Sequence, residues 1–277
     1  MPVTAHDVSH GLVRPWHRGR SFALESRAPQ PTLAHLIDRF WMVRWDLRNR
    51  EPFRQEILPH PSINLVIEPD GARVWGVPTR RDARVLHGQG WALGTKFQPG
   101  AFTAITGLEA HAITNSSLPV TALLHEDLDP ALFADPNDAL ELAVAEIETR
   151  LAPGADIDDP NLELVAAVIA TMRDLAPDAW AKEIAAKHYI APRTLQRLFR
   201  RYVGVSPKWV LKRLRIHDAA QRLATGHEVP WTTLALDLGY YDHAHFIRDF
   251  RLIVGRSPAA YATEARAAQH AARPSAA

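Results

Sequence analysis

The chain has 277 residues, 47% hydrophobic and 23% charged, a balance that is typical of a soluble globular protein and a length sufficient for two domains. It contains no cysteine, which excludes disulfides, thiolate metal sites and a cysteine nucleophile. The net charge of +1 divides unevenly, because residues 1–160 hold 15 basic and 21 acidic residues and residues 161–277 hold 17 and 10. We therefore expect an acidic half and a basic half with different partners.

The first residues, MPVTAHDVSHGLVRPWHRGR, include basic side chains but no apolar run of the kind found in signal peptides. No segment of about 18 apolar residues occurs anywhere in the chain. We expect a cytoplasmic protein that does not use a membrane.

The first half is rich in short β-prone runs separated by Pro, Gly, Asn and Asp, namely RFWMVRWDL, EILP, INLVIEP, RVWGV and ALGTKFQ. This pattern predicts a β-barrel or sandwich-like domain over residues 1–125. Five of the eight tryptophans fall in it: Trp16, Trp41, Trp45, Trp75 and Trp91. They either fill the core of a small barrel or line a ligand cavity.

The boundary between the halves lies where the charge changes sign. Residues 136–151 place Leu140, Val144, Ile147 and Leu151 at helical spacing. The stretch APGADIDDPN follows over residues 152–161 and is rich in Pro, Gly and Asp. We expect residues 126–160 to form a helix and an acidic linker.

The second half contains the same phrase twice, as FRRYVGVSP over residues 199–207 and as FRLIVGRSP over residues 250–258. In the first copy Gly204 suits the left-handed end of a helix, Ser206 can cap the next helix, and Pro207 fits its first turn. Gly255, Ser257 and Pro258 repeat these positions. A supersecondary unit has therefore been used twice.

The helix before the first phrase is amphipathic. Leu195, Leu198, Phe199 and Tyr202 fall within one third of its circumference. The opposite arc holds a basic and amide-bearing set: Arg193, Gln196, Arg197, Arg200 and Arg201. This is either a solvated charged face or one suited to phosphates and purine edges.

Each of these helices follows a shorter helix and a tight turn, which is helix-turn-helix spacing. In the first unit Ala185 lies 14 positions before Phe199, and in the second Ala235 lies 15 positions before Phe250. The second turn, with Gly239 and the capping Asp242, is therefore one residue longer.

Residues 207–225 join the two units. They carry one apolar set at Val210, Leu211 and Leu214 and another at Trp209, Ile216, Ala220 and Leu223. Such a helix packs against both units. It would hold the two recognition helices at a separation that suits successive major grooves, about 34 Å apart.

Residues 163–262 resemble the DNA-binding domain of the AraC/XylS family of transcription regulators, through LQRLFRRYVGVSPKWVLKRLRI and ALDLGYYDHAHFIRDFRLIVGRSPAAY. The pieces ILPHPSINLVI and GTKFQPGAF are similar to the β-rich sensor-like domain of one branch of that family. The resemblance implies an α+β protein of two domains, with the double helix-turn-helix domain over residues 161–265 and a flexible tail over residues 266–277.

The resemblance also implies base contacts from the early exposed positions of each recognition helix. These correspond to Arg193, Gln196 and Arg197 in the first helix and to His243, Ala244, Ile247 and Arg248 in the second. We add Arg200, Arg201 and Arg251 as phosphate contacts. Helical geometry places Ile247 near the inward edge. The sequence departs from the family pattern at Ala191, where a capping serine is usual, and at Tyr189, which is bulky for its turn.

Other chemistry finds little support in the sequence. His243 and His245 lie two positions apart and would point about 200° away from each other on a helix, which does not suit a shared metal. His60, His87, His111 and His125 have no compact metal-ligand spacing. GQGWALG has the wrong glycine spacing for a dinucleotide loop. We expect no metal, no cofactor and no catalytic residues.

The sequence therefore predicts a sequence-specific, effector-responsive DNA-binding transcription regulator and not an enzyme. Double-stranded DNA is its expected partner, with a second copy of the chain, a small-molecule effector and RNA polymerase as further candidates. The alternative is an enzyme whose β-rich half is catalytic and whose helical half docks it to DNA. The sequence leaves open whether transcription rises or falls.

Overall fold

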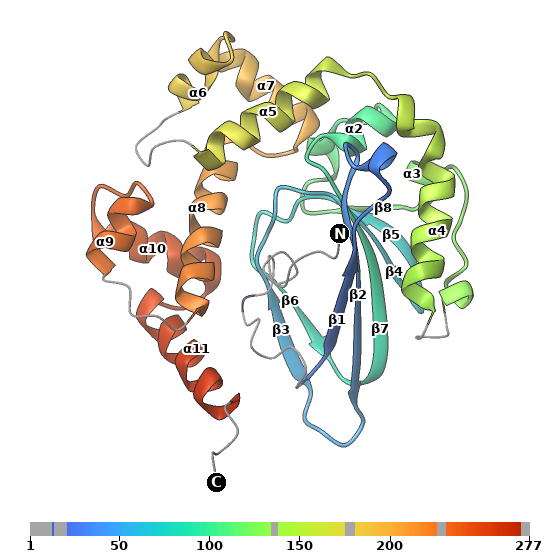
Figure 1. Ribbon diagram of the computed structural model, residues 1–277, viewed down its shortest axis with the longest axis horizontal. Coiled ribbons are helices and arrows are strands. Elements are labelled where there is room, and N and C mark those ends of the chain that lie inside the picture. The colour runs from blue at the N-terminus through green and yellow to red at the C-terminus, as the bar shows by residue number, and fades with distance from the viewer. Residues whose placement is uncertain (1–12, 14–20, 134–137, 175–180, 226–230, 273–277) are drawn as a thin grey trace.

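A computed structural model describes residue 13 and residues 21–133, 138–174, 181–225 and 231–272. An antiparallel β-rich part forms the first half and a row of helices forms the second. The last helices lie along one side of the β-rich part (Figure 1). No helix among the described residues is long and apolar enough to cross a membrane.

The β-rich part contains eight described strands. They are β1 (Ala23–Arg27), β2 (Ile37–Leu47), β3 (Phe53–Ile57), β4 (Asn64–Glu68), β5 (Gly71–Trp75), β6 (Asp82–Leu86), β7 (Gly88–Phe97) and β8 (Ser117–Pro119). Six of them form one sheet in the order β1-β2-β7-β4-β5-β8, and β3 pairs with β6 in a second sheet. The outer strands β1 and β8 are not paired with each other, so the sheet is open. The fold is sandwich-like, and the closed-barrel alternative was wrong.

The large sheet buries both of its faces because successive side chains point to opposite sides of a strand. On β2, Phe40 and Met42 enter the main apolar core. Trp41, Val43 and Trp45 point the other way and meet the β3–β6 pair in a smaller cluster. The alternation along β2 therefore fixes which face the helices cover and which face the second sheet covers.

Two of the tryptophans lie across glycines of the neighbouring strand. Trp41 is paired with Gly94 and Trp45 with Gly90 in the β2–β7 ladder. A Cβ atom added at either glycine would lie within 2.5 Å of the indole ring. These glycines thus make room for the rings, which favours a packing role for these two tryptophans. Trp16 lies outside the described residues.

Short helices cover the other face and lead out of the β-rich part. They are η2 (Pro31–Leu33), α2 (Ala101–Thr106), η3 (Ala110–Ile113), α3 (Thr121–Leu124), η4 (Pro130–Phe133), α4 (Ala139–Leu151) and η5 (Ala152–Asp156). The helix expected over residues 136–151 is thus described from Ala139, since residues 136 and 137 lie outside the described part. Residues 152–156 of the expected linker are helical.

The second half is helical throughout its described residues. It contains α5 (Pro160–Asp174), α6 (Ala181–Lys187), α7 (Pro192–Tyr202), α8 (Pro207–Ala224), α9 (Trp231–Asp237), α10 (His243–Val254) and α11 (Pro258–Ala272). The expectation of a flexible tail over residues 266–277 was wrong for its first seven residues, because α11 continues to Ala272. Residues 273–277 lie outside the described part.

Helix α8 connects two apolar cores. Its first half supplies Val210 and Leu211 to the main core, which also contains the buried side chains of α5, α6, α7 and the β-rich part. Its second half supplies Ile216 and Leu223 to a separate core around α9, α10 and α11. Trp209, expected on the second face, packs instead against the main core, because the two faces separate along the helix as well as around it.

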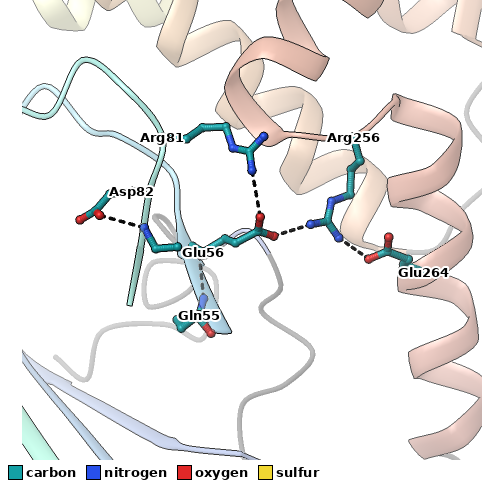
Figure 2. Close-up of polar contacts among 7 residues, drawn as sticks. Gln55, Glu56, Arg81, Asp82, Arg256 and Glu264 are labelled. Atoms are coloured by element: carbon teal, nitrogen blue, oxygen red, sulfur yellow. Dashed lines mark hydrogen bonds and ion pairs between the residues drawn. The ribbon is translucent and has the colours of Figure 1, made fainter. Parts of the chain in front are cut away.

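A buried carboxylate joins the second core to the β3–β6 pair. Glu56 on β3 is 8% exposed and accepts hydrogen bonds from Arg81, at 3.1 Å, and from Arg256, which directly follows the last turn of α10. Arg256 also donates to Glu264 of α11 at 2.5 Å. Figure 2 shows Glu56 between the two guanidinium groups. The β-rich part is thereby tied to the end of the second recognition helix.

We predict that Glu56→Ala lowers stability by roughly 3 kcal/mol, since it leaves two arginines in a largely buried site without their shared carboxylate. Glu264→Ala is the matched control, because it removes the more exposed carboxylate from the same Arg256 and should cost less than about 1 kcal/mol. Thermal unfolding of both variants checks the difference. Equal losses would contradict the central place of Glu56.

Candidate nucleic-acid interface

The first helix-turn-helix unit consists of α6, a tight turn and α7. In the turn the amide of Tyr189 donates to the carbonyl of Ala186 at 3.1 Å, and that of Ile190 donates to Ala185 at 3.0 Å. Tyr189 adopts a left-handed conformation with φ of 55°. Ala191 is the N-cap of α7 and provides no side-chain hydrogen bond, as expected from the missing serine.

Helix α7 has the two faces that its sequence predicts. Leu195, Leu198, Phe199 and Tyr202 are buried. The exposed side carries the predicted contact set: Arg193, Gln196, Arg197, Arg200 and Arg201. The helix ends at the expected left-handed Gly204, with φ of 86°. The hydroxyl of Ser206 accepts the amide of Trp209 and caps α8, as predicted.

The exposed side of α7 is not uniform. Arg193, Gln196 and Arg197 lie toward its N-terminal end, whereas Nη2 of Arg200 lies 3.0 Å from Nε2 of His111 in η3. The Arg201 guanidinium lies over the Tyr202 ring at 5.8 Å. The part of the helix nearest the β-rich part is therefore engaged with the protein itself.

Two threonines of the β-rich part secure the end of α7. Thr103 of α2 donates its hydroxyl hydrogen bond to the carbonyl of Arg201 at 3.1 Å. Thr114, which follows η3, donates to the carbonyl of Gly204 at 2.8 Å. Carbonyl groups at a helix C-terminus lack partners within the helix, so these contacts satisfy groups that would otherwise need water.

The second unit, α9 and α10, repeats the arrangement. Gly239 occupies the left-handed turn position with φ of 76°, and the amide of Tyr240 donates to Ala235 at 2.9 Å. The Asp242 carboxylate accepts the amide of His245 at 2.6 Å, which confirms the predicted cap. Gly255 ends the helix at φ of 92°. The two units are therefore built on the same hydrogen-bond pattern.

Helix α10 presents fewer cations than α7. Its exposed predicted residues are Ala244, Ile247, Arg248 and Arg251, while His243 is half-buried. Ile247, placed near the inward edge by helical geometry, is 39% exposed, so its side chain is accessible from solvent. The structure thus gathers the predicted residues on one exposed side of each recognition helix.

Asp249 is a buried residue of α10 that the sequence reasoning missed. It accepts hydrogen bonds from Lys212 of α8 at 2.9 Å and from the hydroxyl of Tyr240 at 3.3 Å. Burial, and then the Asp249 charge, raise the pKa of Tyr240 above its usual range. The signal was available, because Asp249 lies three positions after Phe246 and therefore on the apolar face.

Two further contacts connect α8 with the β-rich part. Arg213 donates to the carbonyl of Thr79 at 2.9 Å and lies 4.7 Å from the Trp209 ring centre. Burial lowers its pKa to about 10 despite the opposing charge of Asp249, so it remains a cation at neutral pH. His217 lies 3.1 Å from the carbonyl oxygen of Pro59.

Within the described residues, no group of three or more His, Asp or Glu side chains is arranged to hold a metal ion. His245 lies 3.4 Å from the Asp249 carboxylate. The interface is therefore one of cations, amides and hydroxyl groups, which are the donors that proteins direct toward phosphates and base edges.

Comparison with known proteins identifies both parts. Residues 184–264 match the model of a helix-turn-helix domain, and residues 25–119 match a domain of unknown function, DUF6597. No curated protein matches the chain.

Three solved structures are similar to the chain. The DNA-binding domain of AdpA, a global transcriptional factor crystallised with a target DNA, is 30% identical over 40% of this chain and 96% of its own, with a TM-score of 0.34. A probable AraC family transcriptional regulator from Rhodopseudomonas palustris is 28% identical over 36% and 94%, with a TM-score of 0.33. Apo ToxT from Vibrio cholerae is 11% identical over 89% and 98%, with a TM-score of 0.40.

We predict that Asp249→Ala destabilises the second core by roughly 2–3 kcal/mol, because Lys212 and the Tyr240 hydroxyl lose their buried acceptor. His245→Ala removes the exposed neighbour of the same carboxylate and should cost less than about 1 kcal/mol. Urea unfolding followed by circular dichroism measures both. A small effect of Asp249→Ala would show that α8 and α10 are held together by apolar packing alone.

Proposed function

The chain carries an AraC-type helix-turn-helix domain at residues 184–264 and is a DNA-binding transcription regulator, and we propose that its β-rich part controls how the two reading units meet DNA. The observation that carries this proposal is that the β-rich part contacts both units. Thr103, Thr114 and His111 contact the first, and Glu56 contacts the second through Arg256.

The proposed DNA contacts follow the exposed sides of the recognition helices. In the first helix, Arg193, Gln196 and Arg197 read base edges, while Arg200 and Arg201 lie further from the leading end and bind phosphates. In the second, His243, Ala244, Ile247 and Arg248 face the bases and Arg251 binds a phosphate. The two helices differ in sequence, which supports recognition of a site without two-fold symmetry by one chain.

We propose that the β-rich part also binds an effector or a second copy of the chain, or both. For the second copy, α4 and η4 are the favoured surface, since Leu142 and Leu132 remain 49% and 55% exposed there. Helix α4 lies on the far side of the β-rich part from α9 and α10 (Figure 1). A dimer formed through it would leave both recognition helices free. RNA polymerase is a further proposed partner, and the cytoplasm the proposed location.

We predict that Arg197→Ala and Arg200→Ala affect DNA binding differently. Loss of Arg197 should cost roughly 1–3 kcal/mol against one preferred base pair and relax specificity there. Loss of Arg200 should weaken binding to all sequences and lower the salt slope by about one unit.

The measurement is a titration of each variant against a selected binding site, its single-base variants and random DNA at several salt concentrations. A uniform loss for Arg197→Ala, or a changed base preference for Arg200→Ala, would reverse the assigned depths. Absence of binding by the unmodified chain to any duplex would refute the function itself.

We predict that Leu142→Asp weakens self-association at least about tenfold, because it replaces a buried apolar contact by a charge. Sedimentation at micromolar concentration measures the change. Leu108→Asp, at an exposed leucine between α2 and η3, is the control and should sediment like the unmodified protein. A monomer in the unmodified protein, with and without DNA, would remove the dimer proposal.

A further inference from the structure

The turns before the two recognition helices each expose a tyrosine. The side chain of Tyr189 is 97% exposed and that of Tyr241 is 100% exposed. The other tyrosines, Tyr202, Tyr240 and Tyr261, are buried. Packing therefore explains three tyrosines of the chain and leaves these two without a structural role.

The backbone at Tyr189 would suit a glycine better. Its φ of 55° lies in the left-handed region, which side chains with a Cβ disfavour. In the second unit Gly239 occupies the same place: its amide donates to Leu236 at 2.8 Å, as that of Tyr189 donates to Ala186 at 3.1 Å. The first unit thus has a tyrosine where the turn geometry favours its absence.

Tyr241 is the residue by which the second turn is longer. Ile190 and Tyr240 make equivalent hydrogen bonds, to Ala185 and Ala235. The first turn then reaches its N-cap, Ala191, directly, whereas the second passes through Tyr241 before its N-cap at Asp242. The added residue makes no contact that closes the turn.

Both tyrosines lie within two residues of the N-cap of a recognition helix. In helix-turn-helix proteins this end of the helix leads into the major groove, so the preceding turn lies beside the phosphates that line it. A tyrosine hydroxyl is one of the groups that proteins use to bind phosphate oxygens. Both side chains are free to do so without rearrangement of the fold.

We propose that Tyr189 and Tyr241 bind the DNA backbone, each donating a hydrogen bond from its hydroxyl to a phosphate oxygen beside the groove that its helix enters. The proposal rests on the DNA-binding function of this domain. Because the hydroxyl is neutral, each tyrosine fixes the depth and angle of its helix without releasing a counterion. This distinguishes the pair from the arginines of α7 and α10.

The test uses the full-length protein and random-sequence duplexes of about 30 base pairs, long enough for two successive major-groove contacts. Tyr189→Phe and Tyr241→Phe should each weaken binding roughly three- to tenfold, the effect of one hydrogen bond to a charged group. The loss should be similar on every duplex. The salt slope should stay unchanged, since no cation is removed.

Tyr189→Gly separates binding from folding. It relieves the left-handed strain and should leave the thermal midpoint unchanged or raised, while its affinity falls at least as far as that of Tyr189→Phe. His125→Gly is the matched control, since His125 is exposed and has φ of 62° in the β-rich part. It should show the same stability change and unaltered DNA affinity.

Unchanged affinity in the phenylalanine variants would overturn the proposal. A loss that varies with sequence would also overturn it, because it would indicate a base contact. An unmodified chain that binds no duplex would instead refute DNA binding as a whole, and the phenylalanine variants would then add nothing to that result. These results distinguish an error about the tyrosines from an error about the domain.

Discussion

The sharing of α8 between two cores is the constraint on which the arrangement of the reading units depends. The helix has 18 residues, so at 1.5 Å per residue it extends about 27 Å. Its first half is buried with α7 and its second half with α10. Neither unit can turn relative to the other without exposing apolar side chains at one end of α8. The separation of the two recognition helices is therefore set by packing.

The attachment of this assembly to the β-rich part differs at its two ends. The first unit shares the main core with the β-rich part, so separating them would expose a large apolar area. The second is joined mainly through polar groups, at Glu56, Arg256 and Arg213. Polar contacts can be exchanged for water at lower cost than apolar ones. The second unit is thus the more readily displaced of the two.

The sequence predicted local features well and contacts between distant segments poorly. The repeated phrase predicted the helix ends at Gly204 and Gly255 and the cap at Ser206, because these depend on nearby backbone geometry alone. It did not reveal Glu56, whose partners Arg81 and Arg256 come from distant segments. It also left barrel and sandwich unresolved, since alternation along a strand reports two faces but not whether the outer strands pair.

The contact between Arg200 and His111 connects the proposed DNA interface with the β-rich part. An arginine only donates hydrogen bonds, so Nε2 of His111 must accept, and the proton lies on Nδ1, 3.0 Å from Glu109. A DNA phosphate is a charged and therefore stronger acceptor than a neutral imidazole. If Arg200 binds a phosphate, it must leave His111, and the β-rich part loses one contact with the first unit. By linkage, anything that strengthens that contact opposes DNA binding by the same free energy.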